Sequence, residues 1–209
     1  FASRTSAPQT PRRQQEHAGP PLTEHEADLL IERAENLAQD DQPHQAIDLL
    51  TDAVRRAAHD PILALQLRHA LASTLFYADE YTKAAPLYDR VAEQFALDLG
   101  DDAAIVAECR YYAGYCYAQT SRPNEALTRL RFYVDHASPD AGDLAAAEQY
   151  RDARYLVATM LATLGHVDEA HEQFQAVRAL YAEAYGPGSA HVKRLDQQLR
   201  HLDTYISGQ

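Results

Sequence analysis

The chain has 209 residues, 46% of them hydrophobic, and contains 38 Ala against only 8 Gly. Ala favours helices, and β-sandwiches need Gly-rich turns, so this composition predicts an all-α fold. The formal net charge of −12 at pH 7 argues against binding to nucleic acid or anionic lipid, since both require a cationic surface. The sequence has no run of about 18 apolar residues, so we expect no membrane-spanning segment.

The first segment, residues 1–22, is rich in Ser, Thr, Pro, Gln and Arg and carries a net charge of +2, which leaves −14 for the rest. Its apolar content is too low to offset the entropy of ordering, so we predict a flexible linker. It starts at Phe1 rather than Met and lacks the apolar core of a signal peptide, which suggests a fragment of a longer protein. Thr23 and Glu26 have the spacing of a capping box, so the first helix should follow Thr23.

Four later stretches share one pattern of small and large residues. Each opens with a small residue, has a large residue three positions on, an Ala twelve positions on and another large residue four beyond that. The opening residues are Ala34, Ala72, Gly114 and Ala158, and the later alanines are Ala46, Ala84, Ala126 and Ala170. This spacing is typical of a helical hairpin, in which small residues let two helices approach and large ones fill the space around them.

A short polar turn separates the two halves of each stretch. Pro43 and Pro123 fall where the second helix should start, and Asp41 and Ser121 are predicted to cap those helices. After the fourth hairpin, Leu195, Leu199 and Leu202 form one apolar face of a final helix. The pattern predicts helices over 24–39, 43–58, 62–78, 82–97, 102–119, 123–136, 141–164, 167–185 and 189–206.

This pattern resembles the tetratricopeptide repeat (TPR), a helix–turn–helix unit that stacks into solenoids. The resemblance implies a right-handed α-solenoid of four hairpins over residues 23–186, closed by a capping helix within 187–209. The later alanines are 38, 42 and 44 residues apart, against a typical TPR period of 34. The longer period is similar to that of TPRs of the kinesin-light-chain kind.

In a TPR array the first helix of each hairpin lines a concave groove, and the resemblance assigns groove positions to this chain. They are Asp28, Ile31, Glu35 and Ala38 in the first repeat and Gln66, His69, Ser73 and Phe76 in the second. The middle of that groove is aromatic, and Tyr offers a large contact area with few rotatable bonds, which suits recognition. Packing of the same rings between the long helices is the alternative. The candidate contacts are His69, Phe76, Tyr111, Tyr115 and Tyr155.

An arginine recurs four residues before the opening small residue in three of the hairpins: Arg68, Arg110 and Arg154. These arginines should form a ladder that could hold a carboxylate or phosphate group of a partner. We favour the alternative that each of them pairs with an acid of the neighbouring repeat. Suitable acids are Glu108, Asp152 and Glu148.

The sequence has no Gly-rich phosphate loop, nucleophile elbow or HExxH motif, and no His lies at metal-ligand spacing from a Cys. We therefore predict no enzymatic activity, cofactor or metal in this chain. Cys109 and Cys116 are seven residues apart on a predicted helix, about 10 Å, which is too far for a disulfide. Two buried, reduced cysteines fit a cytoplasmic location.

The favoured function is a protein–protein interaction module that binds a partner peptide or helix in the concave groove, with no nucleic acid or membrane partner. A linker followed by PLTEHEADLLIERAENL and long Ala-rich repeats also resembles the C-terminal TPR region of actinobacterial serine/threonine protein kinases. That resemblance implies a regulatory or substrate-recruiting domain. Homodimerisation through exposed aromatic residues or the last helix is a third hypothesis.

Overall fold

The computed structural model describes residues 20–137 and 143–207. In these ranges the chain forms nine α-helices and no strand. The helices pair into four hairpins followed by a single helix, as the repeat pattern predicts. They are α1 (Glu24–Gln39), α2 (Pro43–Arg56), α3 (Pro61–Tyr77), α4 (Tyr81–Leu99), α5 (Ala104–Gln119), α6 (Pro123–His136), α7 (Leu144–Thr163), α8 (Val167–Tyr185) and α9 (Ala190–Ser207).

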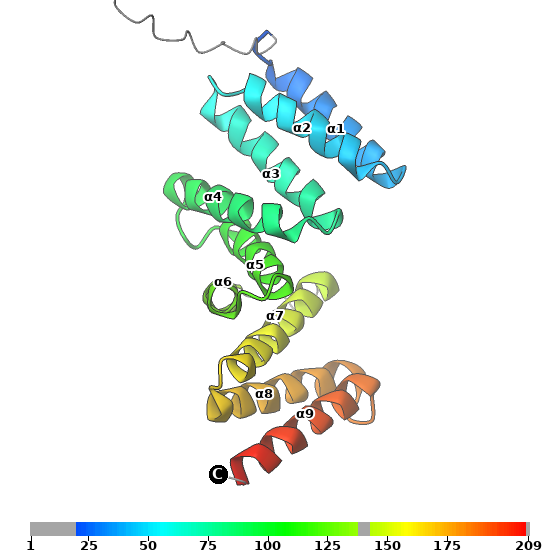
Figure 1. The fold of residues 1–209 in the computed structure, drawn as a ribbon, viewed down its shortest axis with the longest axis vertical. Coiled ribbons are helices and arrows are strands. Elements are labelled where there is room, and N and C mark those ends of the chain that lie inside the picture. The colour runs from blue at the N-terminus through cyan, green and yellow to red at the C-terminus, as the bar shows by residue number, and fades with distance from the viewer. Residues whose placement is uncertain (1–19, 138–142, 208–209) are drawn as a thin grey trace, which may run out of the picture.

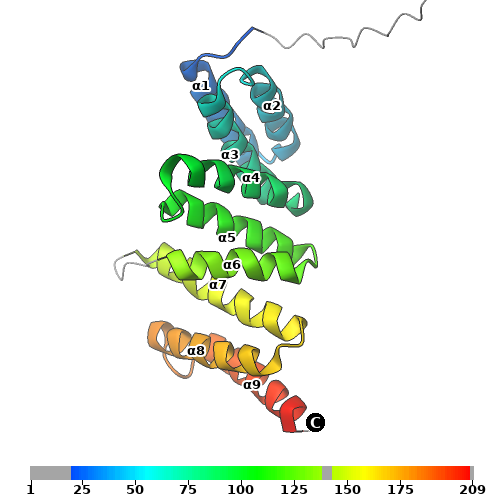
Figure 2. The same ribbon diagram turned by 90° about the vertical axis from the view of Figure 1, so that its left-hand side faces the viewer.

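The helices stack into an elongated column, with α1 and α2 at one end and α9 at the other (Figures 1 and 2). Each helix packs against the next, and the first helices of neighbouring hairpins also touch, α1 against α3 and α5 against α7. We call the side of the column formed by α1, α3, α5 and α7 the first-helix face. The predicted all-α solenoid is therefore confirmed. None of the described helices combines the length and hydropathy needed to cross a membrane.

The small residues of the repeat lie where the two helices of a hairpin meet. All four opening residues and all four later alanines are buried. A Cβ atom on Gly114 would lie 2.7 Å from Cγ of Leu130 in α6, so α5 and α6 approach too closely for any larger residue. Cys109 and Cys116 of α5 are buried and free, as predicted.

In each hairpin, the turn begins with the backbone hydrogen bonds that cap the C-terminus of the first helix. Asp41 and Ser121, predicted as N-caps of the second helices, have φ angles of 60° and 58°, and the N-cap positions belong to Gln42 and Arg122 without a side-chain hydrogen bond. The Gln42 amide donates to the Leu37 carbonyl at 2.8 Å, which is the bond of a Schellman motif. The predicted caps were therefore wrong, because both residues end one helix instead of starting the next.

The same left-handed position recurs in all four turns, seven residues after the opening small residue. Asp79 has a φ angle of 58° there and Gly165 one of 82°. The matching amides of Glu80, Arg122 and His166 each donate to a carbonyl five residues earlier at 2.9 Å. Four equivalent turns give the hairpins one common geometry, so equivalent side chains can be compared between repeats.

The two ends of the column are capped differently. At the start, the predicted Thr23–Glu26 capping box is present, with the Glu26 carboxylate accepting from the Thr23 amide at 2.9 Å. Residues 1–19 of the predicted linker lie outside the described residues, while Leu22 at its end is buried. At the other end, α9 buries Val192, Leu195 and Leu202 and packs against α8, so it covers the last hairpin as expected of a capping helix.

Candidate functional site

A hollow of about 410 Å³ opens on the first-helix face between α1 and α3. It exists because the facing residues are mostly small, with Ala34 and Ala38 on one helix and Ala70 on the other. Ile31, Glu35 and Ala38, at predicted groove positions of the first repeat, all line it. The groove positions implied by the TPR resemblance thus reach a real concavity in the first two repeats. The hollow is further lined by Gln39, Leu50, Ser73, Thr74 and Tyr77.

Aromatic rings occupy the corresponding place one repeat later, between α3 and α5. The Phe76 ring of α3 lies edge-on to Tyr112 and Tyr115 of α5, with centroids 4.9 and 5.4 Å apart. Tyr81 contacts both Phe76 and Tyr115, at 5.8 and 5.9 Å. Phe76 and Tyr115 stay half-buried, whereas Tyr77 beside them is 72% exposed. These rings therefore form a wall next to the α1–α3 hollow, with Tyr77 on its solvent side.

The other three predicted contacts turn toward the second helices. Tyr111 is only 8% exposed and its ring lies 5.1 Å from that of Tyr133 in α6. His69 meets the edges of Tyr88 and Phe95 of α4 at 6.3 and 6.1 Å. Burial lowers the pKa of the His69 imidazole, so the ring is held neutral. These contacts match the packing alternative better than groove binding.

Tyr155 occupies in α7 the repeat position that Tyr111 has in α5. Its ring is half-buried and lies edge-on to Phe174 of α8, 5.9 Å away. The five candidate contacts are therefore not one surface. Phe76 and Tyr115 lie together on the first-helix face, and His69, Tyr111 and Tyr155 contact α4, α6 and α8 respectively.

The three arginines of the predicted ladder lie away from the first-helix face. Arg68 lines a hollow with Leu65 and Leu71, on the side of α3 opposite Ser73 and Tyr77. Arg154 lines a similar hollow between α6, α7 and α8. In the described part of the chain neither arginine has an acidic group within 4.0 Å. Arg110 does have an acidic partner, but it is none of the three acids expected from the sequence.

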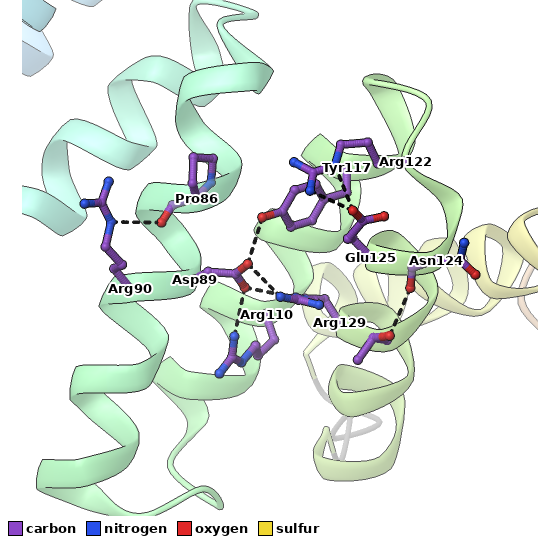
Figure 3. Close-up of polar contacts among 10 residues, drawn as sticks. Pro86, Asp89, Arg90, Arg110, Tyr117, Arg122, Asn124, Glu125 and Arg129 are labelled. Atoms are coloured by element: carbon purple, nitrogen blue, oxygen red, sulfur yellow. Dashed lines mark hydrogen bonds and ion pairs between the residues drawn. The ribbon is translucent and has the colours of Figure 1, made fainter.

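That partner is Asp89 of α4, which is 7% exposed and the buried carboxylate at the centre of a polar cluster (Figure 3). Its Oδ1 accepts from Nη1 of Arg110 at 2.8 Å and from Nε of Arg129 at 3.1 Å. Its Oδ2 accepts from Nη2 of Arg129 and from the Tyr117 hydroxyl, both at 2.9 Å. All four acceptor positions of the carboxylate are thereby used, which offsets the cost of burying it.

This cluster ties α4, α5 and α6 together, since Arg110 and Tyr117 belong to α5 and Arg129 to α6. The hydrogen bond to Asp89 raises the pKa of the Arg129 guanidinium, and burial together with that carboxylate raises the pKa of Tyr117. A signal for Asp89 exists in the sequence, because it follows Ala85 by four residues on the buried face of its helix. The sequence gives no indication of its partners, which come from two other helices.

No family model and no curated protein match the sequence. Among solved structures, TPR-like repeats related to kinesin light chain from Podosopora anserina are similar, with 19% identity, a TM-score of 0.67 and 90% of each chain covered. BtubC (BKLC) from P. vanneervenii has 13% identity and a TM-score of 0.54, covering 88% of this chain and 82% of its own. The apo form of RapI has 12% identity and a TM-score of 0.57, covering 87% and 69%. The chain is a TPR-type α-solenoid.

As a TPR-type solenoid, the molecule offers two chemically distinct faces. The first-helix face has a hollow lined by Ala and an exposed Tyr ring, whereas the opposite side has arginines set between second helices. Among the described residues, no three His, Cys, Asp or Glu side chains are grouped so that they could hold a metal ion. The first-helix face offers apolar contact and the opposite side offers guanidinium groups, which are two chemically different ways of binding a partner.

Proposed function

We propose that this TPR-type solenoid is a protein–protein interaction module that binds an extended segment of a partner protein on its first-helix face. An apolar side chain of the partner would enter the α1–α3 hollow, and the Tyr77 ring would cover the neighbouring residue. The observation that carries the proposal is the open hollow itself, which lies where the TPR resemblance places binding positions.

The chemistry of the hollow supports an apolar side chain as its occupant. Its volume falls within the range of about 300–1,000 Å³ that is common for ligand sites. Ala34, Ala38 and Ala70 supply an apolar lining, and the Thr74 hydroxyl is already bonded to the Ala70 carbonyl at 2.9 Å. The exposed carboxylate of Glu35 at the edge of the hollow could accept from a backbone amide of the bound segment.

The exposed aromatic ring gives the second argument. A large apolar side chain that is 72% exposed gains little from folding, and Tyr is frequent among residues that dominate binding energy. Tyr77 contacts Phe76, with ring centroids 5.4 Å apart, so the ring rests on a packed wall and loses little entropy when a partner binds.

The experiment selects peptides on the protein from a displayed random library and measures their dissociation constants by fluorescence anisotropy. Ala38→Phe should fill the hollow and Tyr77→Ala should remove the exposed ring, and each should weaken binding at least tenfold. Leu99→Ala is the matched control, because Leu99 is also exposed but lies at the end of α4. Peptides that bind Ala38→Phe as tightly as the wild type would contradict the proposal.

The two other hypotheses from the sequence stay predictions with their own tests. A regulatory or recruiting role in a serine/threonine kinase requires a kinase domain encoded upstream of Phe1, so reading that coding sequence decides it. Homodimerisation requires a mass that rises with concentration in sedimentation equilibrium, and a constant monomer mass would exclude it.

A further inference from the structure

Three junctions of the solenoid can be compared residue by residue, because the four hairpins share one geometry. Each junction combines the ladder arginine of a first helix with one residue of the preceding second helix and one of the following second helix. Both positions are counted from the later alanine of the repeat pattern in each second helix (Ala46, Ala84, Ala126, Ala170). The residue of the preceding helix is the fifth after its alanine, and the residue of the following helix is the third after its alanine. The first junction is Thr51, Arg68 and Leu87, the central junction Asp89, Arg110 and Arg129, and the last junction Arg131, Arg154 and Gln173.

The central junction shows how a carboxylate is bound when the protein itself supplies one. A carboxylate from the preceding helix sits between two guanidinium groups, with every contact between 2.8 and 3.1 Å. The ladder arginine Arg110 contributes one of these contacts, and Arg129 contributes a bidentate pair. The position is therefore built to present an arginine to a carboxylate group.

The last junction keeps the arginine but replaces the carboxylate by a second cation. Arg131 occupies the position equivalent to Asp89, and Gln173 the position equivalent to Arg129. A hollow of about 530 Å³ lies there, lined by these three residues with Tyr150, Val134, Asp135 and Val157. The molecule itself thus supplies no carboxylate at the place where the central junction has one.

The ladder arginine of the last junction is incompletely paired. Its Nη2 donates to the side-chain Oε1 of Gln173 at 3.1 Å, and its Nη1 lies 3.5 Å from the Tyr150 hydroxyl. The Nε of Arg154 is buried and has no hydrogen-bond partner among the described residues. A buried donor without a partner is unfavourable because it has lost its hydrogen bonds to water, so an acceptor that reached it would bind favourably.

Two acids lie near the hollow and leave Arg154 without an ion pair. Glu169 of α8 pairs with Arg131, and both side chains of that pair are nearly half-exposed, so the interaction is weak and can rearrange. Asp135 lines the hollow but is an exposed residue. At the first junction the hollow beside Arg68 is lined by Leu87 and also by Arg90 and Glu93 of α4. Nε of Arg90 donates to the Pro86 carbonyl at 3.3 Å. Among the described residues, a buried side-chain donor without a partner is found on Arg154 and not on Arg68, which distinguishes the last junction from the first.

We propose that the last junction binds a carboxylate side chain, Asp or Glu, of an acidic segment of a partner protein. Arg154 would donate to the carboxylate as Arg110 does to Asp89, Arg131 would supply the second guanidinium, and the amide of Gln173 would donate once it turns from Arg154. The site lies opposite the first-helix face, so the proposal does not depend on the α1–α3 hollow and can fail independently of it.

The test measures binding of a fluorescein-labelled hexa-aspartate peptide by anisotropy, together with the Nε–Hε NMR signal of Arg154 during the titration. Binding should shift that signal and should weaken as salt is added. Arg154→Gln should reduce affinity at least tenfold, whereas Arg194→Gln removes the same charge from the exposed surface of α9 and should change it less than twofold. Equal losses in the two variants would show attraction to net charge alone and would overturn the site.

A second variant closes the hollow from within. Arg131→Asp places a carboxylate at the position equivalent to Asp89, so Arg154 should pair internally, the peptide should lose at least tenfold in affinity, and the thermal midpoint should not fall. Arg194→Asp is the charge-matched control. Unchanged binding by a folded Arg131→Asp protein would overturn the proposal, and so would a shift of the Arg154 signal by inorganic phosphate but not by acetate at equal ionic strength.

Discussion

The central and last junctions of the solenoid occupy equivalent positions of the repeat and differ in two of their three defining side chains. In the central junction, Asp89 neutralises two arginines and joins three helices through hydrogen bonds. In the last junction, Arg131 stands at the same position, and Arg154 borders an open hollow. A change of charge sign at the Asp89 position and the loss of a guanidinium at the Arg129 position therefore separate a closed structural contact from an open surface. The repeat fixes where an arginine is presented, and the neighbouring side chains decide whether the protein or a ligand satisfies it.

The largest difference in stability between the two regions should appear at a pair of tyrosines that occupy the same repeat position, one in α5 and one in α7. Tyr111 is buried against Tyr133, whereas the equivalent Tyr155 is half-buried against Phe174. Removing a buried aromatic ring costs about 3–5 kcal/mol, so Tyr111→Ala should lower the free energy of unfolding by about 4 kcal/mol and Tyr155→Ala by about 2 kcal/mol. Urea denaturation followed by circular dichroism gives both values. Equal losses would mean that the two hairpins are packed alike.

The next effect concerns the carboxylate that closes the central junction. Asp89→Asn keeps the shape of the side chain but leaves two largely buried guanidinium groups without a counter-charge. Removing one partner of a buried ion pair costs about 3–5 kcal/mol, and we expect about 3 kcal/mol because both arginines keep some contact with water. The matched control is Asp98→Asn on the same helix, an exposed residue bonded only to Gln94, with a loss below about 0.5 kcal/mol. Similar values for the two variants would contradict the assigned role of Asp89.

A third change tests how tightly the central hairpin is closed. In Gly114→Ala the new methyl group would lie 2.7 Å from Cγ of Leu130, so α5 and α6 must separate or Leu130 must leave its rotamer. Overpacking of this kind costs about 1–3 kcal/mol, and thermal unfolding should show a midpoint lower by several degrees. Gly188→Ala is the control, since a Cβ there meets no atom within 4 Å. A midpoint unchanged in Gly114→Ala would show that the hairpin can open at no cost.

Much of the fold could be predicted because the repeat places one kind of residue at one kind of contact. The alanines at 46, 84, 126 and 170 indicated four hairpins, and every helix boundary fell within three residues of the predicted one. Asp41 and Ser121 were misassigned because both residue types are common as N-caps, while Asp also tolerates the left-handed conformation that ends a helix. Only the hydrogen bonds of the turn distinguish the two roles.

The candidate site could be predicted in part, and the reason lies in helix geometry. The position of a residue along a helix predicts the direction of its side chain only to within about a third of a turn. His69 and Tyr111 lie at the border between the groove and the second helices, so this uncertainty decides which of the two they contact. Their large rings followed the available space toward α4 and α6. Asp89 was missed because its partners lie 21, 28 and 40 residues away on other helices. Aligning the repeats brings out the residues that the hairpins have in common, whereas the two junctions differ at positions that vary between hairpins.

The smallest expected effect is a pH dependence of the free energy of unfolding that arises from His69, which lies between the first and central junctions. His69 faces Tyr88 and Phe95 of α4, and the charge of Glu108 in α5 acts on it. Burial lowers the pKa of His69 below its ordinary value of 6.5, although Glu108 acts in the opposite direction. As the pH falls below 6.5, the unfolded chain therefore binds a proton at this site before the folded one does.

The contribution of His69 to stability is consequently complete above pH 6.5 and decreases as the pH falls toward its folded-state pKa. His69→Gln, which cannot take up that proton, should lose less stability between pH 7.5 and pH 5.5 than the wild type does. Urea denaturation at both pH values measures the difference, and His44→Gln serves as the control because His44 is exposed on α2. A pH dependence equal in wild type and His69→Gln would mean that the imidazole is solvated in the folded protein. In that case His69 would belong to an accessible surface, as the groove hypothesis assumed, and the packed contact with α4 would be the wrong description.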